Sequence, residues 1–339
     1  MSPRVSILVP VYNVEAYIQE TLRSLLRQTF QDFEIVVVND RSTDQTAERI
    51  VALNDPRIRL YTNPQNIGRA GSDNVGMNLV RGELVAKMDG DDLCHPERLA
   101  RQVAFLDAHP TVDVVGSWVQ CFGAGRMLFE YPVQPVDARA MMVFNMTVGN
   151  PSVMLRARLW QEQGLRYDDQ LRQTEDYDFF GRYLPQLTIA NLPEALVQYR
   201  VLPHSVRPAV YDERLRVANQ IRARLLTTFG VSYSTRELHL HNIISHHPFQ
   251  LGDIMLEEVH QWLWKIYVSN QESGFANPAA MLRAVAEQWF LTCYLNPDRR
   301  HNSWREYYRQ PLARHYRLPP RLFAKFAVKN FVLRHLKRS

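Results

Sequence analysis

Three carboxylates lie within four residues, Asp89-Gly90-Asp91-Asp92, directly after an apolar run that predicts a strand over 83–88. Left alone these side chains repel one another, and a divalent cation removes that repulsion. Hard oxygen ligands favour Mg²⁺ or Mn²⁺, and magnesium-type sites take one or two carboxylates while sharing the ion with substrate phosphates. The alternative is a solvated acidic turn that caps the following helix, since Asp is common there. The four residues alone do not decide between the two.

A second acidic pair, Glu175-Asp176, follows Thr174. One of these carboxylates could act as a general base for a substrate hydroxyl. The alternative is the acidic first turn of a helix with Thr174 as its cap, which is a frequent arrangement. Taken by itself, the segment favours the helix start.

Single polar residues at predicted strand ends are further candidates. Asp40 follows the apolar run 34–38 and could accept a hydrogen bond from a ribose hydroxyl or a base N–H, or could simply form a turn. Tyr12, after Pro10, could stack on a base or close the edge of the core. His204 could bind a metal or a phosphate, although most single histidines do neither.

A histidine group in the C-terminal third is weighed as a metal site. His239 and His241 would share one face if their segment were a strand, and His246 and His247 follow shortly. Four imidazoles within nine residues could hold a transition metal. No Cys lies nearby and the spacing fits no zinc pattern, so a polar loop between helices is favoured.

The elements that must position these residues alternate in type. Apolar runs over 5–9, 34–38, 58–61 and 83–88 predict buried strands, and helical spacing between them predicts helices. This order predicts an α/β fold with a mostly parallel sheet, in which ligands bind at the carboxyl ends of the strands. The segments 112–122 and 188–201 predict further strands, and the pattern beyond 211 is helical. We expect domains at 1–210, 211–312 and 313–339, the last a basic amphipathic tail.

The ordered set of motifs resembles family 2 glycosyltransferases with a GT-A fold, of the kind that builds bacterial surface polysaccharides. The resemblance covers about residues 4–206. Its elements are residues 5–13 with Glu15; Asn39-Asp40 with 42–44; Asn66 with Gly68; Asn74 with Gly76; Gly82-Glu83; 89–92; Asn150-Pro151-Ser152; Glu175-Asp176; and Tyr199-Arg200 with His204.

The resemblance implies a role for each matching residue. Asp176 would be the catalytic base, with Glu175 beside it, and Asp91 with His204 would bind Mn²⁺ or Mg²⁺ at the diphosphate. The nucleotide would be bound by Pro10, Tyr12, Asn13, Glu15, Asp40, Asn66 and Asp89. The sugar and acceptor would meet Asp92, Asn150, Pro151 and Ser152. The chain departs from the family at Asp73, where many relatives have Arg, and in the spacing before His204.

The implied reaction is a single displacement that inverts the anomeric centre. The donor would be a nucleotide sugar, most simply a UDP-sugar, and the acceptor a hydroxyl of a glycan or lipid-linked saccharide. One base suffices, unlike the two carboxyl groups of a glycosidase. Two other readings stand beside it. A nucleotidyltransferase should carry a basic Gly-rich loop near its N-terminus, and 10–15 has neither Gly nor Lys; a non-catalytic binding module would not need Asp91 or Asp176.

Composition limits the remaining possibilities. The chain has 339 residues, 46% apolar and 22% charged, so a sizeable core is expected and global disorder is not. Three Cys form no disulfide framework, which predicts a reducing, cytoplasmic setting. We predict no signal peptide and no membrane-spanning helix, because 1–10 has no basic n-region and no 18-residue window is free of charge.

The net charge of +5 is concentrated at one end. Residues 298–339 hold twelve Lys or Arg and two Asp or Glu, giving +10, so the rest of the chain carries −5. Basic and apolar residues interleave over 314–338, which predicts an amphipathic helix lying on an anionic membrane surface, at the inner face of the plasma membrane. The alternatives are a solvated helix packed by its apolar stripe and incidental RNA affinity; no nucleic-acid function is expected.

Overall fold

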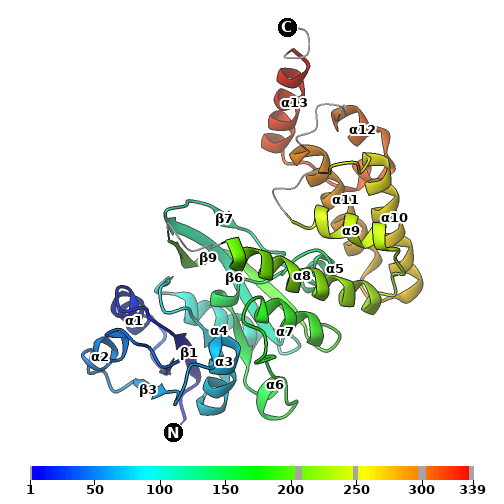
Figure 1. Ribbon diagram of the computed structural model, residues 1–339. Coiled ribbons are helices and arrows are strands. Elements are labelled where there is room, and N and C mark those ends of the chain that lie inside the picture. Colours follow the sequence, from blue (N-terminus) through cyan, green and yellow to red (C-terminus); the bar gives the residue numbers. More distant parts are fainter. Residues whose placement is uncertain (1, 203–207, 247–250, 297–302, 336–339) are drawn as a thin grey trace. The chain divides into compact units, whose positions relative to one another are not determined.

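Strands and helices alternate through the N-terminal part of the chain, and helices alone follow, in the computed structural model, which describes residues 2–202, 208–246, 251–296 and 303–335 (Figure 1). The chain divides into two compact units. The first unit combines Met1–Ala138 with Met146–Ala218, and the second unit combines Arg139–Asn145 with Asn219–Ser339.

The parallel half of the sheet carries the predicted strand ends. Its strands are β1 (Val5–Val11), β2 (Phe33–Asn39), β3 (Ile58–Thr62) and β4 (Leu84–Lys87), in the order β3-β2-β1-β4. All three pairings among them are parallel. Because β1, β2 and β4 run the same way, the residues that follow them meet at one edge of the sheet.

The other half of the sheet is mixed. Beyond β4 the order continues β8-β6-β9-β5, and β7 pairs with β6. Only β6 and β9 are parallel; β8, β5 and β7 run antiparallel to their neighbours. The bounds are β5 (Leu93–Cys94), β6 (Val114–Gly123), β7 (Leu128–Phe129), β8 (Met154–Arg156) and β9 (Ile189–Val201). The predicted α/β class with a helical C-terminal region is confirmed, with a sheet more mixed than expected.

Helices of the first unit cover the sheet and lead into the site. They are α1 (Ile18–Leu26), α2 (Thr46–Val51), α3 (Gly68–Leu79), α4 (Arg98–Ala108), the first half of α5 (Pro135–Met141), the short η1 (Asn150–Ser152), α6 (Arg158–Gln161) and α7 (Glu175–Tyr183). A Cβ at Gly76 of α3 would collide with Leu8 of β1 and press on Val38 of β2. The glycine therefore allows α3 to pack closely enough to bring its N-terminus beside the strand ends.

The second unit is a helical bundle. It contains the end of α8 (Pro208–Thr228), α9 (Thr235–Ile244), α10 (Leu256–Ser273), α11 (Pro278–Leu295), α12 (Ser303–Arg309), η2 (Pro311–His315) and α13 (Pro320–His335). Ser234 and Glu237 form a capping box that starts α9, and Asn277 caps α11. The core includes Trp262, Leu263, Trp289 and Phe290.

Residues 139–145 belong to the second unit although Met146–Ala218 of the first unit follows them in the chain. The Phe144 ring lies 5.2 Å from that of His241, and the Arg222 Nε donates to the Phe144 carbonyl over 2.8 Å. The His241 ring nitrogen Nε2 bonds the Val143 carbonyl at 3.0 Å. These contacts explain why so short a segment is counted with helices that follow it by eighty residues or more.

The tail helix α13 uses part of its apolar stripe for packing. Phe326 is buried among aromatic rings, 5.7 Å from Phe290 and 5.7 Å from Tyr307. Phe323 and Val328 stay exposed. Among the residues that the structure describes, no helix has both the length and the apolar content needed to cross a bilayer.

Candidate active site

Two adjoining cavities lie in the first unit. The smaller, about 250 Å³, is lined by residues that include Pro10, Tyr12, Asp40 and Asp91. The larger, about 550 Å³, is lined by residues that include Asn150, Pro151, Glu175 and Asp176. Arg69 and Asp89 line both. Residues far apart in sequence thus converge on one continuous region, as the sequence predicted for most of them.

Asp40 connects the end of β2 to the start of α3. One oxygen accepts from the Asn63 side chain at 2.8 Å and the Ile67 N–H at 2.9 Å, and the other from the Gly68 N–H at 2.8 Å. The carboxylate therefore fixes the turn before α3, and it also lines the smaller cavity. Its second oxygen keeps capacity for a further donor.

Three of the predicted nucleotide contacts do not line the smaller cavity. Asn13, at φ 51°, accepts the Thr43 N–H at 2.8 Å, and Glu15 accepts the Gln45 N–H at 2.9 Å. The Asn66 side chain donates to the Asp40 carbonyl at 3.1 Å. Here these residues hold the loops that shape the cavity.

The acidic turn after β4 has three differently placed carboxylates. Asp89 forms an ion pair with Arg69. Asp91 lines the smaller cavity, and burial together with the charge of Asp89 raises its pKa. Asp92 is fully buried and outside both cavities; it accepts the Arg200 N–H at 2.8 Å, and burial raises its pKa to about 9. Burial in this turn therefore favours the protonated, neutral forms of Asp91 and Asp92.

The turn offers hard oxygens suited to a divalent cation. One Asp92 oxygen is buried with no hydrogen-bond partner, and Asp91 faces the cavity where a diphosphate would lie. Within the described residues no three His, Cys, Asp or Glu side chains converge as a complete ligand set. That fits a magnesium-type site, in which the protein supplies one or two carboxylates. His204, the other predicted ligand, lies outside the described residues.

Arg69 lines both cavities and forms ion pairs with carboxylates that line them. Besides its ion pair with Asp89, its Nε lies 3.2 Å from a Glu175 oxygen. Burial disfavours its charged form, yet the neighbouring carboxylates raise its pKa further above the ordinary range. Nothing in the sequence marks Arg69 as a site residue, because an arginine early in a predicted helix gives no sign of the groups that it will contact.

The Glu175-Asp176 pair begins α7 and faces the larger cavity. Burial and the charge of Asp176 raise the pKa of Glu175 to about 7. Burial likewise raises the pKa of Asp176, although an Asp176 oxygen accepts the Tyr177 N–H at 2.8 Å. Thr174 precedes them in the left-handed region at φ 64°, unusual for a β-branched residue, and its side chain makes no cap hydrogen bond. The helix start is confirmed with Thr174 at the N-cap position, but the expected capping hydrogen bond from its side chain is not made.

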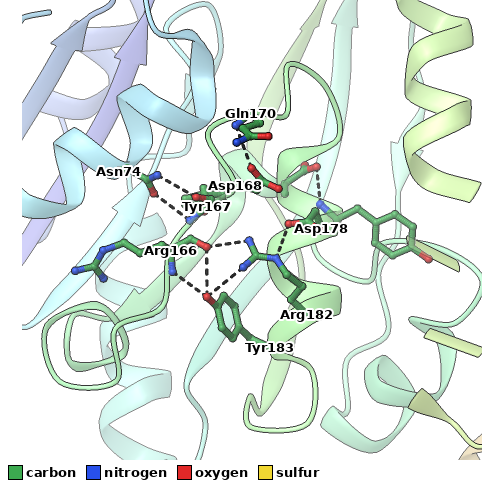
Figure 2. Close-up of polar contacts among 10 residues, drawn as sticks. Asn74, Arg166, Tyr167, Asp168, Gln170, Asp178, Arg182 and Tyr183 are labelled. Carbon is green, nitrogen blue, oxygen red and sulfur yellow. Dashed lines mark hydrogen bonds and ion pairs between the residues drawn. The ribbon is translucent and has the colours of Figure 1, made fainter. Parts of the chain in front are cut away.

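The loop that leads into α7 is pinned from two sides (Figure 2). The Asn74 amide donates to the Tyr167 carbonyl and accepts from its N–H, both at 3.0 Å. From α7, Arg182 pairs with Asp178 at 2.6 Å and donates to the Arg166 carbonyl at 2.9 Å. The cavity wall that follows this loop is therefore preorganised.

A buried ion pair contacts the same loop through Tyr167. The Lys87 Nζ lies 2.5 Å from a carboxylate oxygen of Asp73, and both side chains are fully buried. The ammonium also donates to the Tyr167 hydroxyl at 3.2 Å and lies 4.5 Å from that ring's centre. Asp73, the departure from the family pattern, is thus balanced by a lysine at the end of β4.

The 150–152 segment contributes two of its three predicted residues to the larger cavity. Asn150 and Pro151 line it, and Asn150, 7% exposed, has a buried side-chain oxygen without a hydrogen-bond partner. The Ser152 hydroxyl instead bonds the backbone of Gly149 at 2.7 Å and of Ser117 at 3.0 Å. Aromatic and basic lining residues that sequence reasoning did not assign to this cavity are Phe129, Tyr131, Arg172, Tyr199 and Arg214.

The histidine group of the second unit is structural. His239 and His241 lie in helix α9, so the shared strand face and the favoured polar loop are both wrong for these two residues. His241 is fully buried between the Val143 carbonyl and the Trp262 indole N–H, which donates to it at 3.2 Å, and burial lowers its pKa to about 3. No metal-binding cluster occurs among the described residues, and His247 lies outside them.

Comparison with known proteins finds relatives over most of the first unit. Residues 6–135 match the family model described as Glycosyl transferase family 2. An uncharacterized glycosyltransferase of Methanocaldococcus jannaschii is 31% identical over 214 residues, 59% of this chain and 71% of that protein.

Solved structures share the fold at low sequence identity. The S. aureus TarS 1–349 complex with UDP-GlcNAc has a TM-score of 0.57 and 22% identity, covering 90% of this chain and 88% of that one. The mannosyltransferase PcManGT from Pyrobaculum calidifontis, in complex with GDP-Man and Mn²⁺, has a TM-score of 0.52 and 19% identity, covering 98% and 88%. The expected GT-A fold is confirmed.

Proposed function

This chain belongs to glycosyltransferase family 2, and we propose that it moves a sugar from a UDP-sugar to a hydroxyl of a glycan or lipid-linked saccharide, inverting the anomeric centre. The observation that carries the proposal is the pair of adjoining cavities that share Arg69 and Asp89. A donor needs a nucleoside pocket and a reacting centre a few ångströms apart, and the two cavities supply both.

The smaller cavity fits the nucleoside. Tyr12 is half exposed at the end of β1 and offers a ring face to a base, and the free capacity of Asp40 suits a ribose or base donor. Asp91 would hold Mn²⁺ or Mg²⁺ here, with His204 as a second ligand. Bound at Asp91, the cation would neutralise charge on the departing diphosphate. The structural neighbour bound to GDP-Man and Mn²⁺ supports this assignment.

The larger cavity fits the acceptor and the transferred sugar. Asp176 accepts the proton of the attacking hydroxyl, and its burial raises its pKa toward the range useful for a base. Glu175 and Arg69 set the local charge beside it, since Arg69 pairs with both Glu175 and Asp89. The unpartnered oxygen of Asn150 accepts a sugar hydroxyl. A hexose or N-acetylhexosamine is the proposed sugar.

The proposed setting is cell-surface polysaccharide synthesis at the cytoplasmic face of a membrane. The exposed basic residues of α13, which include Arg321 and Lys325, support a contact with anionic lipid. The interaction would hold the enzyme peripherally beside a lipid-linked acceptor.

Calorimetric titration with UDP, with and without Mn²⁺, tests the proposal, followed by a panel of nucleotide sugars and assays of their hydrolysis. We expect metal-dependent UDP binding, weakened about tenfold or more in Asp91→Asn and unchanged in Asp55→Asn, a carboxylate paired with Arg57 away from both cavities. Binding of GDP or dTDP in place of UDP contradicts the donor assignment. Donor binding with neither hydrolysis nor transfer indicates a non-catalytic binding module.

A further inference from the structure

Two arginines line the larger cavity without a carboxylate partner. Within the described residues Arg69 is paired, but neither Arg172 nor Arg214 forms an ion pair. By contrast Arg216, two residues beyond Arg214, pairs with Glu213 at 2.7 Å. Resting on the proposed function, we propose that Arg172 and Arg214 bind an anionic group of the acceptor, a phosphate or a carboxylate.

Both arginines lie on the stretch of wall next to the base. The Arg214 Nε donates to the Gln173 side-chain oxygen at 2.8 Å, so Arg214 of α8 is joined to the residue after Arg172. Gln173 is three residues before Asp176, and all four residues line the same cavity. An acceptor whose hydroxyl reaches Asp176 therefore brings a neighbouring substituent to the two guanidinium groups.

The backbone that leads to Arg172 is fixed by hydrogen bonds, and the Arg172 side chain is exposed in the cavity wall. The preceding loop is pinned by the Asn74–Tyr167 and Arg182–Arg166 hydrogen bonds (Figure 2). The Arg172 guanidinium lies directly against Gly68, at φ +81°, where any Cβ would collide with it. A planar guanidinium at this position can meet both oxygens of a carboxylate or phosphate.

The rest of the cavity fits a saccharide with such a charge. Phe129, Tyr131 and Tyr199 supply aromatic surface for sugar rings, and Asn150 supplies its unpartnered oxygen. The donor diphosphate is the competing anion, but it belongs beside Asp91, and the smaller cavity is lined by neither Arg172 nor Arg214. The acceptor class is therefore an anionic saccharide, carrying a phosphate ester or a uronic acid.

The experiment titrates the full-length protein with glycerol 1-phosphate, with glucuronate and with neutral glucose. Each titration is run on the free protein and on protein saturated with UDP and Mn²⁺. The variants are Arg172→Gln, Arg214→Gln and the double substitution, with Arg216→Gln as the matched control on α8. Thermal unfolding checks that each variant keeps its fold.

We expect at least one anion to bind in the presence of UDP, and the double variant to weaken that binding about tenfold or more. Arg216→Gln and the affinity for glucose should stay within about twofold of wild type. The stronger of the two anions identifies phosphate or carboxylate. Equal affinity in the double variant, displacement of the anion by UDP, or no anion binding at millimolar concentration overturns the inference.

Failure of the proposed function would look different. Loss of the donor reaction shows as absent UDP binding and absent nucleotide-sugar hydrolysis by wild type, while the titrations on the free protein still report on Arg172 and Arg214. The two claims can therefore fail separately.

Discussion

The two units treat buried charge in opposite ways. The first unit buries seven carboxylates: Glu34, Asp40, Asp73, Asp92, Asp113, Glu175 and Asp178. Among the described residues of the second unit, no Asp or Glu is buried, and its buried polar groups are neutral or, like Arg222, bonded to backbone carbonyls. Since a buried carboxylate costs free energy unless paired, the first unit retains them for a reason that the helical bundle lacks.

The buried carboxylates of the first unit differ in the partners that surround them. Glu34 accepts from Ser6 at 2.7 Å and pairs with Arg59 at 2.6 Å, which are stabilising bonds of an ordinary interior. Glu175, which lines the larger cavity, instead has a pKa that burial raises to about 7. Burial alone therefore does not indicate a catalytic carboxylate. A buried carboxylate that lines a cavity and whose charge is not fully balanced by partners is the better indicator.

The substitution with the largest expected effect tests whether a buried carboxylate of the first unit takes part in catalysis. Asp176→Asn removes the proton acceptor and should lower the rate of sugar transfer about a thousandfold, with UDP binding unchanged. Single-turnover transfer and UDP titration measure the two quantities. Asp212→Asn, an exposed carboxylate lining neither cavity, is the control. Transfer at the wild-type rate in Asp176→Asn would remove the base assignment.

A second test uses the pH dependence of stability to measure whether the Glu175 carboxyl is protonated in the folded protein. Folding raises the pKa of Glu175 from 4.5 to about 7, with Asp176, Asp73 and Arg69 around it. The folded state then holds a proton that the unfolded chain has released, so this residue's contribution to stability falls as pH rises from about 4.5 to 7.

Denaturant unfolding at pH 5 and at pH 7.5 measures that slope. Glu175→Gln should reduce the loss of unfolding free energy over this interval by up to about 3 kcal/mol. An identical pH dependence in the variant and the wild type would mean that Glu175 is fully ionised throughout, and would weaken the contrast between the units.

The third test addresses the second unit. His241→Phe leaves the Val143 carbonyl and the Trp262 N–H without partners and should lower the free energy of unfolding by about 2 kcal/mol. Sugar transfer at a permissive temperature should stay within about twofold of wild type. The exposed His239→Phe is the control. A large loss of transfer without a loss of stability would assign chemistry to the second unit.

The smallest effect concerns the tail. Arg321→Gln and Lys325→Gln should each weaken binding to vesicles containing anionic lipid by about 1 kcal/mol, roughly fivefold. Cosedimentation at two salt concentrations measures this, with neutral vesicles as the control. Deleting 314–339 would also remove Phe326 from its aromatic cluster, so substitutions separate lipid contact from folding. Unchanged partitioning would favour a solvated helix packed by its apolar stripe.

The local sequence pattern was sufficient to predict the positions of the strands and the edge of the sheet where the polar residues meet. The predicted runs 5–9 and 34–38 lie within β1 and β2, and Asp40, Asp89 and Asp91 all line the expected cavity. Strand burial and strand ends depend on neighbouring residues, which a sequence displays directly.

The sequence pattern did not predict the features that depend on contacts between residues far apart in the chain. Arg69, Arg172 and Arg214 look like ordinary surface cations until α3, the pinned loop and α8 are brought to one cavity. Asp92 and Ser152 match motif positions, yet their side chains bind backbone groups away from the cavities. The assignment of 139–145 to the second unit depends on His241 and Arg222, about eighty to one hundred residues later.

That seven-residue segment also bears on how such a protein can be shortened or recombined. A chain cut within α8 would keep Ala140, Met142, Val143 and Phe144 but lose the helices that bury them. The exposed apolar segment would favour self-association of the fragment. By the same reasoning, adding or removing only the residues after α8 would separate 139–145 from the rest of the helical bundle, because that part of the bundle is encoded before Met146.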